Sequence, residues 1–374
     1  MSTVPPRVAS SRPRVLLVTA SEFWRPISGD HARTAALVGA LARHCELSVM
    51  YAGAMDDAAR REARAGQPPF RIVAGNQGRP SREGVLRAFR QVCGALAPQA
   101  VILSRLRLDF LRAAVPAGVP CVLDTHDLES DSAAAAGTAA PPDFDAELAL
   151  LARYDKVLLI QRDDHARVVA RLGARAMCVP HPVRLEPAPV RPGSRTIGYC
   201  ASRWVSNVRA LQWLLDEIWP ALRARGATLQ VAGFVTRSLP APPPDGVVSR
   251  GYVQGLQALW SGFDVAVNPV RDGSGLKIKN VEALAAGIPL VTTTDGARGL
   301  RDAVGDAILV ADDAPEFARA CLRLLDDDAL RARMAAGAHA YAGANFSPEA
   351  CFGGLLGWLA SLAEPARPGA PARH

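Results

Sequence analysis

The 374-residue sequence lacks the long apolar runs and cysteine pairs that mark membrane, secreted or zinc proteins. The run VLLVTA, which follows MSTVPPRVASSRPR, is too short for a signal sequence or a membrane-spanning helix, and no other run is long enough to span. Seven scattered cysteines form no C-x-x-C pair, so neither a metal-ligand spacing nor a disulfide framework is present. They indicate reduced core residues of a cytoplasmic protein.

Lysine is also scarce, since only three of the 43 basic residues are lysine. Two of them, Lys277 and Lys279, share one turn of an expected helix. The arginines are not interleaved with aromatic residues, which argues against nucleic-acid binding. Asp143 and Asp145 follow two prolines at a helix start, where carboxylates are expected as caps, so we predict no metal site and no cofactor.

The rest of the chain predicts two α/β domains. Hydrophobic residues make up 49% of the sequence, enough for two cores, and apolar strands alternate with helices as in parallel sheets. Five prolines in residues 180–195 indicate a linker, and the Ala-rich stretch 133–140 is expected to be mobile. We predict a first domain over 1–190, a second over 191–345, a C-terminal helix over 346–364 and a disordered tail over 365–374.

The most informative stretch is DVAVNPVRDGSGLKIKNVEALAAGIPLVTTTDGARGL, residues 264–300. A strand, a glycine turn and an Ala-rich helix closed by Gly287 lead to a second strand at 290–293. Glycines let backbone N–H groups approach an anion, and a helix N-terminus adds its dipole, so the turn suits a phosphate. Lys277, in the first helical turn, favours a pyrophosphate. For Lys279 we favour a solvated helix face with a salt bridge to Glu282.

Two loops of the first domain follow strands. Gly29 precedes a helix over 30–43 that Asp30 is expected to cap, but the loop lacks G-x-G-x-x-G, so dinucleotide binding has weak support. DTHDLESD, residues 124–131, carries four acids and a histidine at a strand end, which favours a functional site. His181, in the linker, is a weaker candidate that we expect to face the cleft. The histidines that lie in helical patterns are expected to be surface or core residues rather than catalytic ones: His44, His165 and His339.

These motifs resemble the retaining family 4 glycosyltransferases. The resemblance is carried by G-S-G-L-K-I-K, E-A-L-A-A-G-I-P-L-V-T, I-G-Y-C-A-S, D-T-H-D, V-P-H-P and L-Q-V-A-G. It implies the α/β GT-B fold, with two Rossmann-like domains facing a central cleft and a C-terminal helix that crosses back to the first domain. The second domain would bind a nucleotide sugar and the first an acceptor.

By the same resemblance, Glu282 would hold the ribose hydroxyls of the donor. His126 would lie near the transferring centre, with Asp124 and Asp127 orienting it or the acceptor hydroxyl. Many family members carry a sugar-binding glutamate where this chain has Ser274, which leaves the sugar open, and Asp272 is the nearest substitute. The remaining donor-binding candidates are Gly29, Arg203, Gly273, Ser274, Gly275 and Lys277.

The function implied is transfer of a sugar, with retention of configuration and without a metal, from a UDP- or GDP-linked donor to a glycan or lipid-linked acceptor. Two alternatives share the fold: a nucleotide-sugar 2-epimerase and a non-catalytic binding subunit. We expect a cytoplasmic protein. An arginine cluster in the first half is compatible with peripheral binding to an anionic inner membrane face, although solvated helix faces explain it equally well. The cluster comprises Arg60, Arg61, Arg64, Arg79, Arg82, Arg87 and Arg90.

Overall fold

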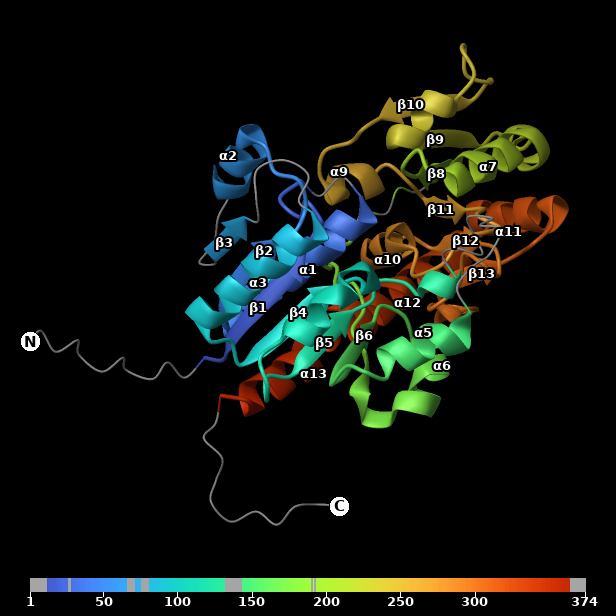
Figure 1. Cartoon of the computed structure of the whole chain (residues 1–374). Coiled ribbons are helices and arrows are strands. Elements are labelled where there is room, and N and C mark those ends of the chain that lie inside the picture. Colours follow the sequence, from blue (N-terminus) through green and yellow to red (C-terminus); the bar gives the residue numbers. More distant parts are fainter. Residues whose placement is uncertain are drawn as a thin grey trace, which may run out of the picture.

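The computed structural model describes residues 12–25, 28–65, 71–74, 81–131, 143–189, 191 and 193–363. The expectations for the Ala-rich stretch 133–140, for the tail 365–374 and for Arg79 lie outside these residues, as do the side chains of Arg60 and Arg64. The chain forms two lobes, each built on one twisted parallel sheet (Figure 1).

The first sheet has seven strands in the order β3-β2-β1-β4-β5-β6-β7. All neighbouring pairs are parallel. Its strands are β1 (Arg14–Thr19), β2 (Glu46–Tyr51), β3 (Arg71–Ala74), β4 (Ala100–Ser104), β5 (Cys121–Asp124), β6 (Lys156–Leu159) and β7 (Ala176–Cys178). The connecting α-helices are α1 (Gly29–His44), α2 (Asp57–Ala65), α3 (Arg82–Leu96), α5 (Phe144–Leu151) and α6 (Arg162–Leu172).

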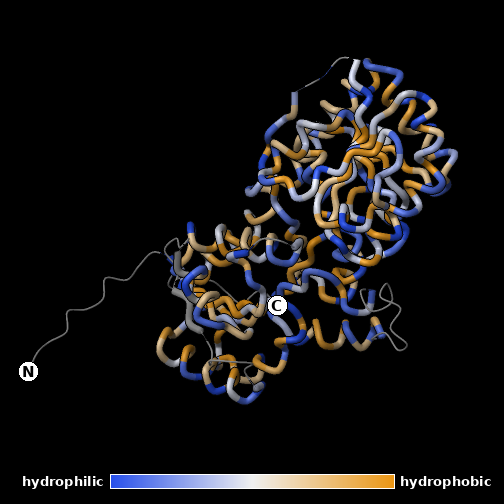
Figure 2. Tube along the Cα trace, turned by 90° about the horizontal axis from the view of Figure 1, so that it is seen from above, coloured by the Kyte–Doolittle hydropathy of each residue, from blue (hydrophilic) through white to orange (hydrophobic). Residues whose placement is uncertain are grey.

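The second sheet has six parallel strands in the order β10-β9-β8-β11-β12-β13. They are β8 (Thr196–Cys200), β9 (Thr228–Ala232), β10 (Val247–Gly251), β11 (Val265–Asn268), β12 (Leu290–Thr292) and β13 (Ile308–Val310). Its α-helices are α7 (Val205–Trp213), α8 (Trp219–Arg223), α9 (Leu256–Trp260), α10 (Ile278–Ala285), α11 (Ala314–Asp326) and α12 (Asp328–Phe346). Parallel sheets need apolar cover on both faces, and apolar residues line the interior of both lobes (Figure 2).

The last helix, α13 (Pro348–Ser361), returns to the first domain, as predicted. It packs against α1 and β7. Its buried face includes Phe352, whose ring lies 5.7 Å from the Arg33 guanidinium carbon. The predicted arrangement of two α/β domains with a crossing C-terminal helix is therefore confirmed. No helix among the described residues is both long and apolar enough to cross a membrane.

Two local features were not predicted from the sequence, and one local prediction, the cap of the first helix, was wrong. The helical stretch from α7 to α8 contains a π-helical segment at Leu214–Ile218, just before Pro220, which has no N–H for the helical ladder. A 3₁₀ helix at Leu106–Ala114 was missed. Helix α1 is capped by the Ser28 side chain, which accepts from the backbone N–H of His31, and this leaves Asp30 free for other partners.

Candidate active site between the two domains

The functional loops gather where the strand order of each sheet reverses. In the first sheet this point lies between β1 and β4, and in the second between β8 and β11. The chain leaves neighbouring strands in opposite directions there, which opens a crevice at the carboxyl edge of the sheet. Residues that follow β1, β4 and β5 meet at the first crevice, and residues that follow β8 and β11 meet at the second.

His126 lies in the first crevice between two carboxylates. Its Nδ1 is 3.2 Å from Oδ1 of Asp30, and its Nε2 is 3.2 Å from Oδ2 of Asp124. Ser104 Oγ lies 3.3 Å from the same Nε2. Arg105 donates to Oδ1 of Asp30 at 2.9 Å, so a cation and an imidazole share that oxygen. The ring is buried and held on both edges.

Asp124 stays ionised although it is buried. Burial alone would raise its pKa, but Arg33 and His126 hold the pKa well below its usual range. Arg33 is itself fully buried and donates to Oδ1 of Asp124 at 3.1 Å and to the carbonyl of Pro180 at 2.6 Å. The fold therefore supplies a fixed negative charge directly behind His126.

Asp30, whose side chain is less buried than that of Asp124, also has its pKa lowered by neighbouring groups. Burial opposes its ionisation, yet Arg105 and His126 keep its pKa below the ordinary value. Arg105 and His126 both adopt positive φ, at 76° and 63°. Such backbone is uncommon outside glycine and persists where surrounding contacts over-determine it, often at functional sites. Both residues contact Asp30, so the conformations and the polar contacts support one another.

The glycine loop forms the opposite wall. Gly273 and Gly275 have φ of 105° and 74°, a conformation that glycine adopts without steric cost. Lys277 is the N-cap of α10, one residue before the helical turn in which it was expected. Its Nζ donates to the carbonyls of Gly273, Ser274 and Gly275 at 3.3, 3.0 and 3.1 Å. Lys277 therefore holds the curvature of the loop.

The two walls touch. A Cβ built on Gly275 would come within 1.8 Å of Oδ1 of Asp127, and one built on Gly29 would come within 3.3 Å of the Ile278 side chain. Burial lowers the pKa of Lys277, and the charge of Asp127 opposes that shift. Of the two aspartates expected to orient His126, Asp124 lies within hydrogen-bonding distance of the ring, whereas Asp127 faces the glycine loop.

Glu282 lines a cavity of about 450 Å³ beside α9 and the linker. Burial raises the pKa of its carboxyl to about 7, although Lys279 opposes the shift. The remaining cavity walls are Val183, Arg184, Glu186, Gly255, Leu256, Gln257, Trp260 and Ala286.

Arg203 and Asp272 pair with residues outside the His126 cluster. Arg203 is exposed and donates to Ser238 Oγ at 3.3 Å, and Asp272 accepts from Arg209 at 3.3 Å. His181 is buried, and this burial together with Arg33 and His126 lowers its pKa to about 3, so it is neutral near pH 7. His339 lies 2.9 Å from the carbonyl of Ala285.

The prediction for Lys279 was wrong. It is half-buried, donates to Asn207 Oδ1 at 2.7 Å and lies 5.3 Å from the centre of the Tyr199 ring, and no ion pair with Glu282 forms within 4 Å among the described residues. Sequence reasoning also missed the roles of Arg33, Asp30 and Arg105. In the sequence these residues stand near the ends of strands or helices. Polar residues are common there for many reasons, so this position alone does not identify a functional site.

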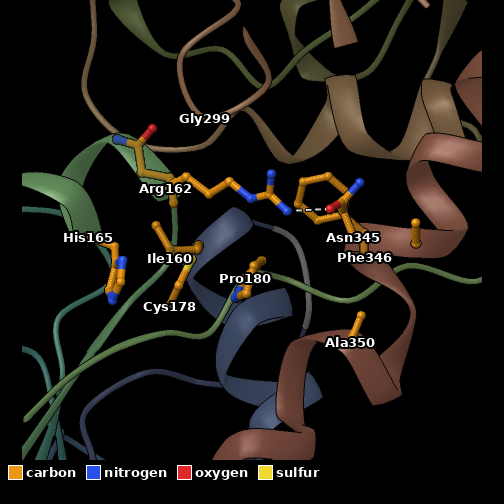
Figure 3. A pocket seen from close by; sticks show the side chains of 11 residues that line it. Ile160, Arg162, His165, Cys178, Pro180, Gly299, Asn345, Phe346 and Ala350 are labelled. Atoms are coloured by element: carbon orange, nitrogen blue, oxygen red, sulfur yellow. Dashed lines mark hydrogen bonds between the residues drawn. The ribbon is translucent and has the colours of Figure 1, made fainter. Parts of the chain in front are cut away.

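A second cavity, of about 410 Å³, lies between the domains beside the start of α6 and the α12–α13 junction (Figure 3). Arg162 reaches across it to Asn345 and pairs with Asp302. His165, expected to be a surface or core residue of a helix, lines this cavity. Asp143 and Asp145 lie at the N-cap and in the first turn of α5, and in the described part of the chain no three His, Cys, Asp or Glu side chains are grouped to hold a metal ion.

Residues 194–327 match the model of a family described as "Glycosyl transferases group 1". A Klebsiella pneumoniae protein described as an uncharacterized 44.6 kDa protein in the cps region is 25% identical over 126 residues. That match covers 30% of this chain and 32% of the relative, so the chain spans about a third of the curated relative's length.

Solved structures match nearly the whole chain in fold. HepE of Anabaena, crystallised with UDP and glucose, superposes with a TM-score of 0.71 at 14% identity, covering 94% of this chain and all of HepE. Sucrose-phosphate synthase of Thermosynechococcus elongatus gives a TM-score of 0.72 at 17% identity with the same coverage. WaaG, a glycosyltransferase of lipopolysaccharide biosynthesis, gives 0.62 at 13% identity, covering 90% of this chain and 98% of WaaG.

Proposed function

We propose that this chain, which has the GT-B fold and matches the group 1 glycosyltransferase family over residues 194–327, transfers a sugar from a nucleotide-sugar donor, with retention of configuration, to a glycan or lipid-linked acceptor. The observation that carries the proposal is the contact between the two domains at the cleft. The glycine loop before α10 lies against Asp127, beside the buried His126 cluster. A donor diphosphate on the loop would present its sugar to His126.

Each feature of the site has a proposed role in binding the nucleotide-sugar donor. Glu282, at the wall of its cavity, would accept hydrogen bonds from both ribose hydroxyls. The backbone of Gly273, Ser274 and Gly275 and the start of α10 would surround the diphosphate. Gly29, at the start of α1, would approach it from the other domain, and Arg203 would approach from the loop after β8.

The chemistry fits a front-face displacement. The acceptor oxygen bonds to the anomeric carbon as the bond from that carbon to the diphosphate breaks, and the acceptor proton moves to the departing phosphate oxygen. No protein base is needed. His126, held by Asp124 and Asp30, would stabilise charge on the transferring sugar, and loop N–H groups would stabilise the leaving diphosphate.

The relatives narrow the expected substrates. HepE has been crystallised with UDP-glucose, which favours a UDP-sugar donor here. The cps-region relative and WaaG favour an acceptor from surface polysaccharide assembly. On helix α3, Arg82, Arg87 and Arg90 are exposed and would attract an anionic inner membrane surface, although Arg87 also pairs with Glu83.

A panel of UDP- and GDP-sugars scored by thermal shift tests the proposal, because a bound donor raises the melting temperature by mass action. The stabilising donor is then incubated with a panel of glycan and lipid-linked acceptors, and without acceptor as a control. Transfer with retained configuration supports the proposal. An epimerised donor in the acceptor-free sample would identify the 2-epimerase instead, and binding without turnover would identify a binding subunit.

A further inference from the structure

Two helix N-termini converge on the crevice of the second domain. Helices α7 and α10 follow β8 and β11, the strands between which the sheet order reverses. Ser206 Oγ, in the first turn of α7, lies 4.0 Å from the position of a Cβ on Gly273. The side chains of the two N-cap residues, Trp204 and Lys277, make no capping hydrogen bond. The N–H groups and dipoles of the two helices therefore favour an anion at this point.

Lys277 has no hydrogen-bonding capacity left for that anion. An ammonium group carries three N–H donors, and the three carbonyls of the glycine loop lie within hydrogen-bonding distance of Lys277 Nζ. A phosphate that bonded Lys277 would have to displace one of those carbonyls. Lys277 therefore stabilises the conformation of the glycine loop through its own hydrogen bonds.

Lys279 differs in this respect. Among the described residues, Asn207 Oδ1 is the one hydrogen-bond acceptor within reach of its Nζ, at 2.7 Å. The ammonium also lies over the ring of Tyr199, 5.3 Å from its centre. At least one N–H remains for a ligand. Asn207 belongs to the first turn of α7, so Lys279 points its charge between the two converging helices.

The charges around Lys279 come from three other groups. Glu282 and Lys277 belong to α10 or its cap, and Cys200 ends β8. Burial lowers the pKa of Lys279 to about 7 and raises the pKa of the Cys200 thiol to about 12, so the thiol is neutral. A lysine desolvated with little compensation is stabilised in its charged form by an incoming anion.

We propose that Lys279 is the cation that contacts the diphosphate of the donor directly, and that Lys277 is a positioning residue that shapes the loop. The inference rests on the proposed function and sharpens it. It assigns to Lys279 the diphosphate contact that the sequence suggested for Lys277. The alternative is that Lys279 only fastens α7 to α10 through Asn207.

Titration calorimetry with inorganic pyrophosphate, UDP, GDP and the corresponding nucleosides separates these roles. We expect Lys279→Met to weaken pyrophosphate and nucleoside diphosphate binding by about 30-fold or more, through loss of a charge-assisted contact. Nucleoside affinity should change much less, because nucleosides carry no phosphate and are affected only through the influence of Lys279 on the ionisation of Glu282. Asn207→Ala is the matched control, since it removes the link between the helices and keeps the cation, and its pyrophosphate affinity should stay within about threefold.

Proton uptake on binding is a second measurement, and it would not change in the variant if Lys279 had a purely structural role. Pyrophosphate binding at pH 7.5, measured in buffers of different ionisation enthalpy, should take up protons in the wild type and fewer in Lys279→Met.

Equal losses of affinity in Lys279→Met and Asn207→Ala, or unchanged binding in Lys279→Met, would overturn the inference while leaving the proposed function intact. Lys279-dependent binding of pyrophosphate without any nucleotide binding would support the anion site and refute the proposed donor. A wild type that binds none of these probes would overturn both.

Discussion

Asp127 of the first domain lies so close to Gly275 of the second that a Cβ at position 275 would come within 1.8 Å of its Oδ1. Gly275 also has a φ of 74°, which an alanine adopts only with strain. Contact and conformation both require glycine at this position. The loop that faces the first domain is therefore matched to it in shape.

The first prediction is that Gly275→Ala lowers both stability and transferase activity. The new methyl group has to displace Asp127 or open the cleft, so we expect kcat/KM to fall by at least about tenfold and the free energy of unfolding by about 1–3 kcal/mol. Gly353→Ala is the control, because a Cβ there meets nothing within 4 Å inside α13. Urea denaturation should show that the control is unchanged or slightly more stable. Equal behaviour of the two variants would contradict the matched contact.

The second prediction concerns the buried pair behind His126. Arg33→Met leaves the Asp124 carboxylate, 1% exposed, without its main cation, and such a loss costs about 3–5 kcal/mol of folding free energy. The double variant Arg33→Met with Asp124→Asn removes both charges and should recover most of that loss. Chemical denaturation of the three proteins checks this. A double variant as unstable as Arg33→Met alone would show that packing of Arg33, not the charge of Asp124, dominates.

The same residues show how far sequence reasoning could go. The strand, glycine turn and helix of 264–300 were predictable, because periodicity and glycine preferences act within a few residues of one another. The burial of Lys279 was not, because its helix position is the same whether solvent or Asn207, 72 residues earlier, lies beside it. Asp30 likewise fits the pattern of a helix cap, and only the fold brings Arg105 and His126 to its carboxylate.

The third prediction is a pH dependence of nucleoside binding. Burial raises the pKa of Glu282 to about 7, so the carboxyl is mainly protonated below that pH and ionised above it. The ionised form accepts two hydroxyl hydrogen bonds more strongly, so nucleoside affinity should increase as pH rises from 6 to 8. Glu282→Gln should bind more weakly and without this dependence. A wild-type affinity that falls over this range would contradict the ribose role.

For nucleoside diphosphates, Lys279 adds the opposite dependence. Burial lowers its pKa to about 7, so its charge is lost as pH rises through that value. Glu282 gains its charge and Lys279 loses its charge over the same pH range, so the expected affinity for UDP has a maximum near pH 7. Lys279→Met should remove the decline on the alkaline side, and calorimetry across pH 6 to 8.5 measures both limbs. A decline that persists unchanged in Lys279→Met would assign it to another group.

The last prediction concerns Asp164, which is 3% exposed and accepts from Gln161 at 2.8 Å. Burial, with smaller contributions from Asp131 and Asp127, raises its pKa from 3.8 to about 6. A carboxyl with a raised pKa contributes stability that is fully present below pH 3.8 and is lost as pH rises through about 6. Asp164→Asn keeps an oxygen for Gln161 and cannot ionise, so at pH 8 it should be more stable than the wild type by about 2 kcal/mol. The difference should vanish near pH 3, where the aspartate is protonated in both the folded and the unfolded chain, and urea denaturation at the two pH values measures it. A gain of equal size at both pH values would show that it does not arise from ionisation of Asp164.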